Sequence, residues 1–151
     1  PFVIHRDLLT HYSPFFAAAL KGNFAEAETQ KVNLPDERVD TFEIFVEWLY
    51  SQRLDTTAPP QATGPFLKDG KPAFFSLLHL YSLADRLCIE DLRNDIVDAV
   101  ATLAERANAV PTPSDTHLLY VAIRPSAPLR ALVLDLFAFK KTDALLATHP
   151  D

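Results

Sequence analysis

The sequence has no methionine, one cysteine and only three glycines in 151 residues. The single cysteine, Cys88, excludes an internal disulfide and a cysteine-based zinc site, and it suits a reducing compartment. We therefore expect a cytoplasmic or nuclear protein. With so few glycines, the chain carries no glycine-rich phosphate loop. Without methionine, Pro1 is not expected to be the natural start of translation, so we expect the chain to be part of a longer protein.

Long apolar runs and an excess of basic charge are also missing. No segment approaches the length that spans a bilayer, and no signal segment opens the chain. The 20 acidic and 14 basic residues give a net charge of -6, which repels phosphate and anionic lipid. We expect no nucleic-acid partner and no membrane partner. The 48% hydrophobic content is ample for one packed domain.

The first thirty-four residues predict short strands around helices. Residues 31–34 alternate in polarity, and Phe2 and Ile4 share one face of an extended segment, so residues 2–5 and 31–34 predict strands, the first followed by a turn. Ser13 and Pro14 predict a helix start, because serine caps the first amides and proline fits the first helical position. Gly22 is expected to end that helix in a left-handed conformation. We expect His5 to pack beneath the helix with its ring nitrogens bonded to backbone groups.

A core helix is predicted from Asp40, with Glu43 completing a capping box. Apolar residues on most sides of it indicate that it is covered by the rest of the chain. Core packing is favoured over a cofactor-binding aromatic box, whose members would be Phe42, Phe45, Trp48 and Tyr50.

The segment 51–72 contains prolines and glycines that exclude a helix, and it predicts a surface excursion. Within it, Phe66 either tucks onto its own domain or acts as a docking anchor. Helices are predicted at 73–87 and 90–107, joined tightly at Cys88, which we expect to be buried as a small hydrophobe.

The last forty residues predict further helices that pack back on the domain. Thr112 begins one of them and Ser126 another. A final short turn of helix is predicted around Leu145 and Leu146.

The sequence carries no recognisable catalytic or metal-binding pattern. The five histidines have no ligand spacing, and no hydrolase elbow occurs. His5-Arg6-Asp7-Leu8 matches one protein-kinase motif, but Tyr12 stands where the motif has asparagine, and the other kinase motifs are missing. We predict no cofactor, no small-molecule substrate and no enzyme activity. An enzyme with an unrecognised site is the remote alternative.

Several motifs occur together in one order. F-x-x-H-R-x-L-L-x-x-x-S-x-x-F covers residues 2–16, F-x-E covers 24–26, and V-x-L-P-D covers 32–36. With residues 42–50 and 80–92, this order resembles the BTB/POZ domain, most closely its fungal branch. The resemblance implies an α+β fold in which a small sheet is flanked by helices.

The resemblance also implies a division of the chain. Residues 1–107 correspond to the BTB/POZ domain, with a loop insertion at about 52–72, and residues 108–151 to a helical extension that packs on it. The family fold has a further strand before Phe2, paired with residues 2–5, which is not among these residues.

Members of the family form homodimers, and the resemblance assigns Arg6 to a charged pocket opposite an acidic residue of that upstream strand. A solvated Arg6 is the alternative. Phe15, Phe16 and Leu20 are the expected dimer contacts. Adjacent phenylalanines on one helix cannot both face one core, so we expect one to be buried and one available.

Phe24 and Glu26 match a pattern of family members that recruit cullin-3, the scaffold of a ubiquitin ligase. In that role they lie at the edge of the cullin-binding face. The alternative is that Phe24 seals the core and Glu26 is solvated. We therefore predict a self-associating adaptor, with an oligomerisation domain of a transcriptional regulator, without cullin binding, as the second interpretation.

Overall fold

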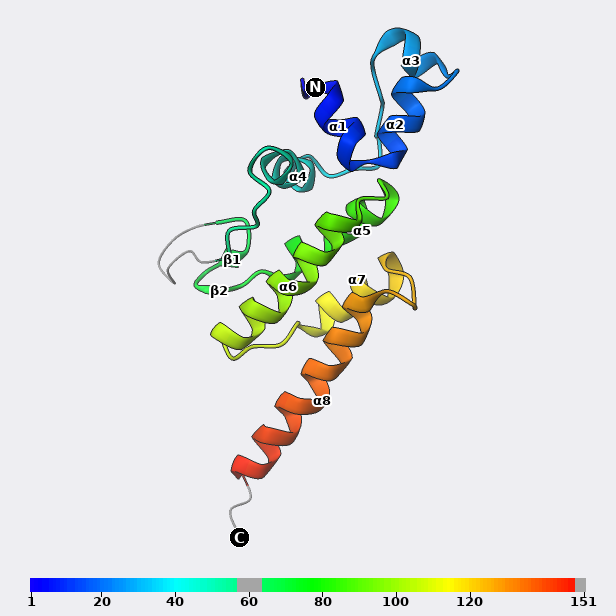
Figure 1. The fold of residues 1–151 in the computed structure, drawn as a ribbon. Coiled ribbons are helices and arrows are strands. Elements are labelled where there is room, and N and C mark those ends of the chain that lie inside the picture. Colours follow the sequence, from blue (N-terminus) through cyan, green and yellow to red (C-terminus); the bar gives the residue numbers. More distant parts are fainter. Residues whose placement is uncertain (57–63, 149–151) are drawn as a thin grey trace. The chain divides into compact units, whose positions relative to one another are not determined.

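The computed structural model describes residues 1–56 and 64–148. The chain divides into two compact units, which are described separately. Unit 1 comprises residues 1–54 and 79–96, and unit 2 comprises residues 55–78 and 97–151. Figure 1 shows that both are mainly helical.

Unit 1 has four helices of its own and shares two with unit 2. Its own are α1 (Arg6–Tyr12), α2 (Pro14–Lys21), α3 (Ala25–Thr29) and α4 (Val39–Ser51). The shared helices are α5 (Phe74–Arg86) and α6 (Glu90–Arg106), which pass from one unit to the other.

The predicted start of α2 is confirmed. The Ser13 hydroxyl oxygen accepts a hydrogen bond from the Phe16 amide at 3.2 Å, and the hydroxyl donates to the carbonyl oxygen of Leu87 at 2.6 Å. One buried side chain therefore caps α2 and ties it to the end of α5.

Gly22 ends α2 as predicted, but not in the predicted left-handed conformation. Its φ is -83°, which is an ordinary extended conformation. A Cβ at this position would instead overlap the carbonyl oxygen of Ala18, so close backbone approach explains the glycine.

Helix α4 is a core helix, as predicted. Phe45, Trp48 and Leu49 are buried, and the Trp48 indole N–H donates to the Asp95 carboxylate at 2.8 Å. The predicted capping box is wrong, because α4 begins at Val39 and Asp40 is its second residue.

Helices α5 and α6 form the expected tight connection, but Cys88 is exposed, not buried. Its φ of 57° is left-handed. The Cys88 amide donates to Asp85 at 3.2 Å and the Ile89 amide to Ala84 at 2.9 Å, which is the Schellman pattern of a helix end. In this motif Ile89 is buried, and the cysteine faces solvent.

The α+β class is confirmed, although the strands lie elsewhere than expected. Residues 2–5 and 31–34 form no strand, and Arg6–Tyr12 is helical where a turn was expected. Within the described residues, the sheet consists of β1 (Leu67–Lys68) paired antiparallel with β2 (Lys71–Pro72). Asp69 and Gly70 have φ values of 53° and 72° and make the two-residue turn between them.

Unit 2 contains this hairpin, α7 (Pro113–Ala122) and α8 (Pro128–Thr148). Phe66 is buried, so it tucks onto its own chain. Thr112 begins α7 with a capping box to Asp115. Helix α8 begins at Pro128 and is continuous, so the separate final turn expected near its end is wrong.

In unit 2, the long side chains of Arg130 and Lys140 donate hydrogen bonds to backbone carbonyl oxygens at helix ends. Arg130 donates to the carbonyl oxygens of Ile123 and Tyr120, both at 2.7 Å, and lies over the Tyr120 ring. Lys140 donates to the carbonyl oxygens of Ala104 and Ala109 at the end of α6. These contacts close the ends of α6 and α7, where backbone carbonyls lack partners within the helix.

Candidate protein-interaction surface

Helix α2 presents its two phenylalanines in different directions. Phe16 is 3% exposed and Phe15 is 37% exposed, with their rings edge to face at a centroid distance of 5.4 Å. Leu20, one turn after Phe16, is also buried. The expectation that one phenylalanine is buried and the other available is therefore confirmed. Of the three predicted α2 contacts, Phe15 is the one that offers surface in this chain.

The buried face of α2 lines a groove of about 810 Å³ in unit 1, the amino-terminal groove. Residues 1–4 and 30–34 also line it, and its apolar side chains include Phe2, Leu9, Phe16, Leu20, Val32 and Phe42. Phe2 and Phe42 pack with ring centroids 4.9 Å apart.

Two segments without regular secondary structure line this groove, and neither pairs as a strand with another described residue. The backbone amides of residues 2–4 and 31–34 make no hydrogen bond to another described residue. Unpaired extended backbone is able to accept an added strand.

Arg6 also lines the groove. It is exposed, donates to the Gln30 side chain at 3.4 Å and lies 3.8 Å from the Asp7 carboxylate. Both contacts are weak, because exposed ion pairs contribute little. The predicted acidic partner from an upstream strand is not among these residues, so that role stays a prediction.

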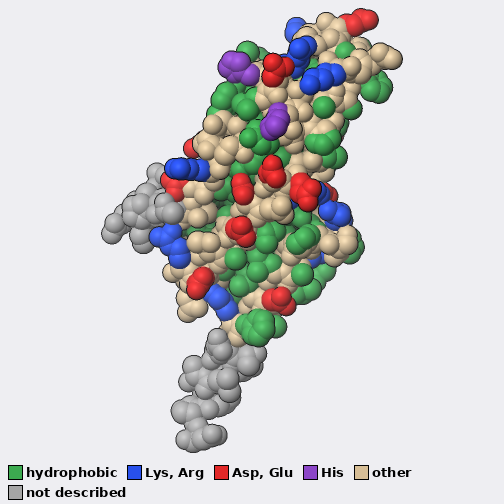
Figure 2. Space-filling view, viewed as in Figure 1, with side chains coloured by type: hydrophobic (Ala, Val, Ile, Leu, Met, Phe, Trp, Pro, Cys, Tyr) green, Lys and Arg blue, Asp and Glu red, His purple; other side chains and the backbone are tan. Residues whose placement is uncertain are grey.

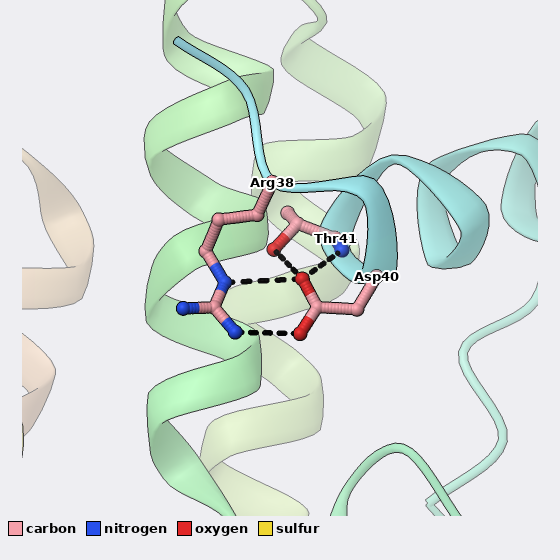
Figure 3. Close-up of polar contacts among 3 residues, drawn as sticks. All are labelled: Arg38, Asp40 and Thr41. Carbon is pink, nitrogen blue, oxygen red and sulfur yellow. Dashed lines mark hydrogen bonds and ion pairs between the residues drawn. The ribbon is translucent and has the colours of Figure 1, made fainter. Parts of the chain in front are cut away.

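A charged cluster forms the groove wall near the start of α4. The Arg38 guanidinium donates two hydrogen bonds to the Asp40 carboxylate, at 3.0 and 2.6 Å. The same carboxylate accepts a hydrogen bond from the Thr41 amide at 2.8 Å (Figure 3). The hydrogen bonds from Arg38 hold the pKa of Asp40 below its usual value. Beside this pair, Glu37 bonds Arg86 of α5.

Helix α3 begins at the other predicted surface. Phe24, immediately before it, is 62% exposed, and Glu26 in its first turn is half-buried. The alternative in which Phe24 seals the core is therefore wrong. An aromatic side chain held beside a carboxylate at a helix start is available to a partner.

His5 bonds a different group from the one expected. It is exposed, and its Nδ1 lies 2.7 Å from the Tyr50 hydroxyl, which also accepts from the His5 amide at 3.2 Å. This contact fastens the amino-terminal segment to α4. It explains the exposed Tyr50 without a cofactor site.

The described residues do not group into a metal site. No cluster of three or more histidine, cysteine, aspartate or glutamate side chains occurs among them. None of the helices, over the residues described, has the length and apolar character to cross a membrane. Figure 2 shows acidic, basic and hydrophobic side chains intermingled on the face in view.

Exposed aromatic side chains and an apolar groove are typical of a protein-interaction surface. The model of the BTB/POZ domain family matches residues 1–102, so the chain belongs to this family. Neither a curated protein nor a solved structure matches the chain.

Sequence reasoning missed two features of these surfaces. The amino-terminal groove is lined by residues 1–4 and 30–34, which are about thirty residues apart in the sequence. No local sequence pattern therefore predicts it. The Glu37–Arg86 contact joins residues 49 apart. The hairpin turn, in contrast, had a local signal in Asp69-Gly70, a dipeptide typical of such turns.

Proposed function

We propose that this chain is a homodimerising adaptor domain. The observation that carries the proposal is the divergence of Phe15 and Phe16, which leaves one aromatic ring on the outside of α2. A large aromatic side chain on a firmly capped helix is a good contact for a second copy. The chain works in the cytoplasm or nucleus.

The amino-terminal groove supports the same proposal. In the family, a strand lies before residues 2–5, and here the backbone amides of residues 2–4 and 31–34 make no hydrogen bond to another described residue. Arg6 lines the groove, and we assign it to the charged pocket that family members form with an acidic residue of that strand.

Light scattering of the unmodified chain and of Phe15→Glu tests self-association. We expect a dimer mass for the former and a monomer mass for Phe15→Glu, because the glutamate places a charge in an apolar contact. The variant should retain its melting temperature within a few degrees, since the ring is partly exposed.

Phe75→Glu is the matched control, because Phe75 is also a partly exposed helical phenylalanine. It should remain a dimer. A monomer mass for the unmodified chain, or a Phe15→Glu variant of unchanged mass, would contradict the dimer.

We also propose that the start of α3 recruits cullin-3. The exposure of Phe24 beside Glu26 supports this role, with the ring filling an apolar pocket and the carboxylate making a contact at the rim.

Titration calorimetry with the amino-terminal domain of cullin-3 tests recruitment. Phe24→Ala should weaken binding by about 2 kcal/mol and Glu26→Ala by less than about 1 kcal/mol, because buried aromatic anchors contribute more than rim charges. Exposed Glu43 is the control for loss of a charge. If the folded chain does not bind cullin-3 at all, it serves as an oligomerisation domain, as in a transcriptional regulator.

A further inference from the structure

Two dipeptides of the sequence place a hydroxyl residue directly before a proline, Ser13-Pro14 and Thr112-Pro113. This is the order that proline-directed protein kinases modify. Both dipeptides begin a helix, because the hydroxyl caps the first amides and proline fits the first helical position. The two are therefore alike as sequences, and only their surroundings in the fold distinguish them.

The structure hides one of these hydroxyls and presents the other. The Ser13 side chain is fully buried, and its hydroxyl donates to the carbonyl oxygen of Leu87 at 2.6 Å. Thr112 is exposed, and so are Pro113 and Ser114, which follow it. Residues 109–112 have no regular secondary structure, and the Thr112 backbone is extended, with φ -74° and ψ 167°. The catalytic aspartate of a kinase has to reach the hydroxyl that it activates, so Thr112 is the accessible one.

We propose that Thr112 is a phosphorylation site for a proline-directed protein kinase, with ATP as the phosphoryl donor. The Thr112 Oγ1 forms a bond to the γ-phosphorus of ATP, the bond from that phosphorus to the bridging oxygen breaks, and ADP leaves. The hydroxyl proton passes to the catalytic aspartate of the kinase. The product carries nearly two negative charges at neutral pH where the chain had a neutral hydroxyl.

The phosphate acts on the capping box at the start of α7. In the unmodified chain, the Thr112 hydroxyl donates to the Asp115 carboxylate at 2.8 Å and accepts from the Asp115 amide at 3.3 Å. The same carboxylate accepts from the Thr112 amide at 2.7 Å, and Asp115 is only 7% exposed. Phosphorylation removes the hydroxyl donor and places a dianion beside this buried carboxylate.

The start of a helix attracts anions, so two effects compete at Thr112. The amino terminus of α7 offers about half a positive charge, which favours a phosphate there. That half charge cannot balance a phosphate and the Asp115 carboxylate together, because they carry nearly three negative charges between them. Repulsion is therefore the larger effect, and we expect phosphorylation to open the first turn of α7.

The site is independent of the dimer and cullin proposals, and its test uses neither partner. The folded chain is incubated with ATP and a purified mitogen-activated protein kinase, which is proline-directed, and the phosphate is located by tandem mass spectrometry. We expect one phosphate, on Thr112, and none on Ser13, the internal control with the same dipeptide. Thr112→Val should take up no phosphate, and Thr112→Ser should still be modified.

Pro113→Ala should slow the modification of Thr112 about tenfold or more, because the kinase loses its contact with the proline ring. Ser114→Ala is the matched control and should leave the rate unchanged, since it alters an exposed neighbour outside the dipeptide. No phosphate at all, a phosphate on another residue with Thr112 unmodified, or an unchanged rate in Pro113→Ala would overturn the site. Should Thr112→Val fail to fold, the unmodified chain and Pro113→Ala decide the matter.

Amide hydrogen exchange by NMR tests the effect of the phosphate on α7. The Asp115 amide donates to the Thr112 side chain, and the Thr116 amide donates to the Thr112 carbonyl oxygen at 2.9 Å. We expect the protection of both amides to fall about tenfold on phosphorylation, and that of the Gln52 amide, at the end of α4, to stay constant. Unchanged protection in a chain that carries the phosphate would show that the capping box stays closed.

Discussion

At the scale of single residues, the effect of a side chain on stability depends more on its position in the hydrogen-bond network than on its chemical type. Ser13 and Thr29 both carry hydroxyls that bond backbone carbonyls. Ser13 is buried, however, and joins segments 74 residues apart, whereas Thr29 is exposed and bonds its own helix. Loss of the first leaves buried groups unpaired, and loss of the second leaves groups that water can reach.

Ser13→Ala should therefore lower the free energy of unfolding by about 1–3 kcal/mol, since the Phe16 amide loses its cap and the Leu87 carbonyl its donor. Thr29→Ala should change it by less than about 0.5 kcal/mol. Urea unfolding followed by Trp48 fluorescence measures both, because this is the single tryptophan and lies in unit 1. Equal losses in the two variants would refute the bridging role of Ser13.

Some features of these single residues were predictable from the sequence, and others were not. The Ser13-Pro14 start was predictable because capping depends on three or four adjacent residues. The exposure of Cys88 was not, because a left-handed helix end turns a side chain outward whatever its hydrophobicity. The partner of His5 was equally hidden, because Tyr50 is 45 residues away.

At the scale of elements, helix ends are fixed by close backbone approach as well as by capping. Helix α2 ends where Gly22 passes the carbonyl oxygen of Ala18, whose hydrogen bond with the Gly22 amide is 3.0 Å long. A side chain at this position would force the end of the helix to shift. Gly64, before β1, has open space around it.

Gly22→Ala should destabilise unit 1 by about 1–3 kcal/mol, because the new methyl group overlaps backbone that cannot move freely. Gly64→Ala should be neutral within about 0.5 kcal/mol. Differential scanning calorimetry of the two variants gives the comparison. A destabilised Gly64→Ala beside an unchanged Gly22→Ala would show the steric argument to be incorrect.

Helices were more predictable than strands for a physical reason. Local periodicity and caps specify a helix; α4 and α7 begin within a few residues of expectation, and α5 and α6 begin and end so. A strand needs a partner strand, and the local sequence of residues 2–5 and 31–34 supplies none. The dimer and cullin contacts depend on second chains, so the sequence and the single chain leave them as predictions.

At the scale of the whole molecule, the titration of His79 makes overall stability depend on pH. Because the pKa of His79 is lowered in the folded chain, the unfolded chain binds the proton more readily below about pH 6.5. The contribution of His79 is therefore complete above that pH and is lost as the pH falls through the folded pKa. Asp40 acts in the same direction, but only below its ordinary value of 3.8.

The free energy of unfolding should therefore fall between pH 7.5 and pH 5.5, by at most about 1 kcal/mol, since His79 is half-buried and solvent screens it. His79→Gln should reduce this pH dependence. The pH dependence that remains should come from the other titratable groups. Urea midpoints at the two pH values measure the effect. A midpoint that rises on acidification would contradict the assigned direction.

Unit 1 is assembled from two stretches of chain separated by residues 55–78. During synthesis, Trp48 emerges long before Asp95, its hydrogen-bond partner, and Ser13 long before Leu87. A nascent chain that has not reached Leu87 thus holds Ser13 and Trp48 without the groups that they bond in the folded unit. While the residues between the two stretches are being synthesised, ribosome-associated chaperones must shield the growing polypeptide from aggregation.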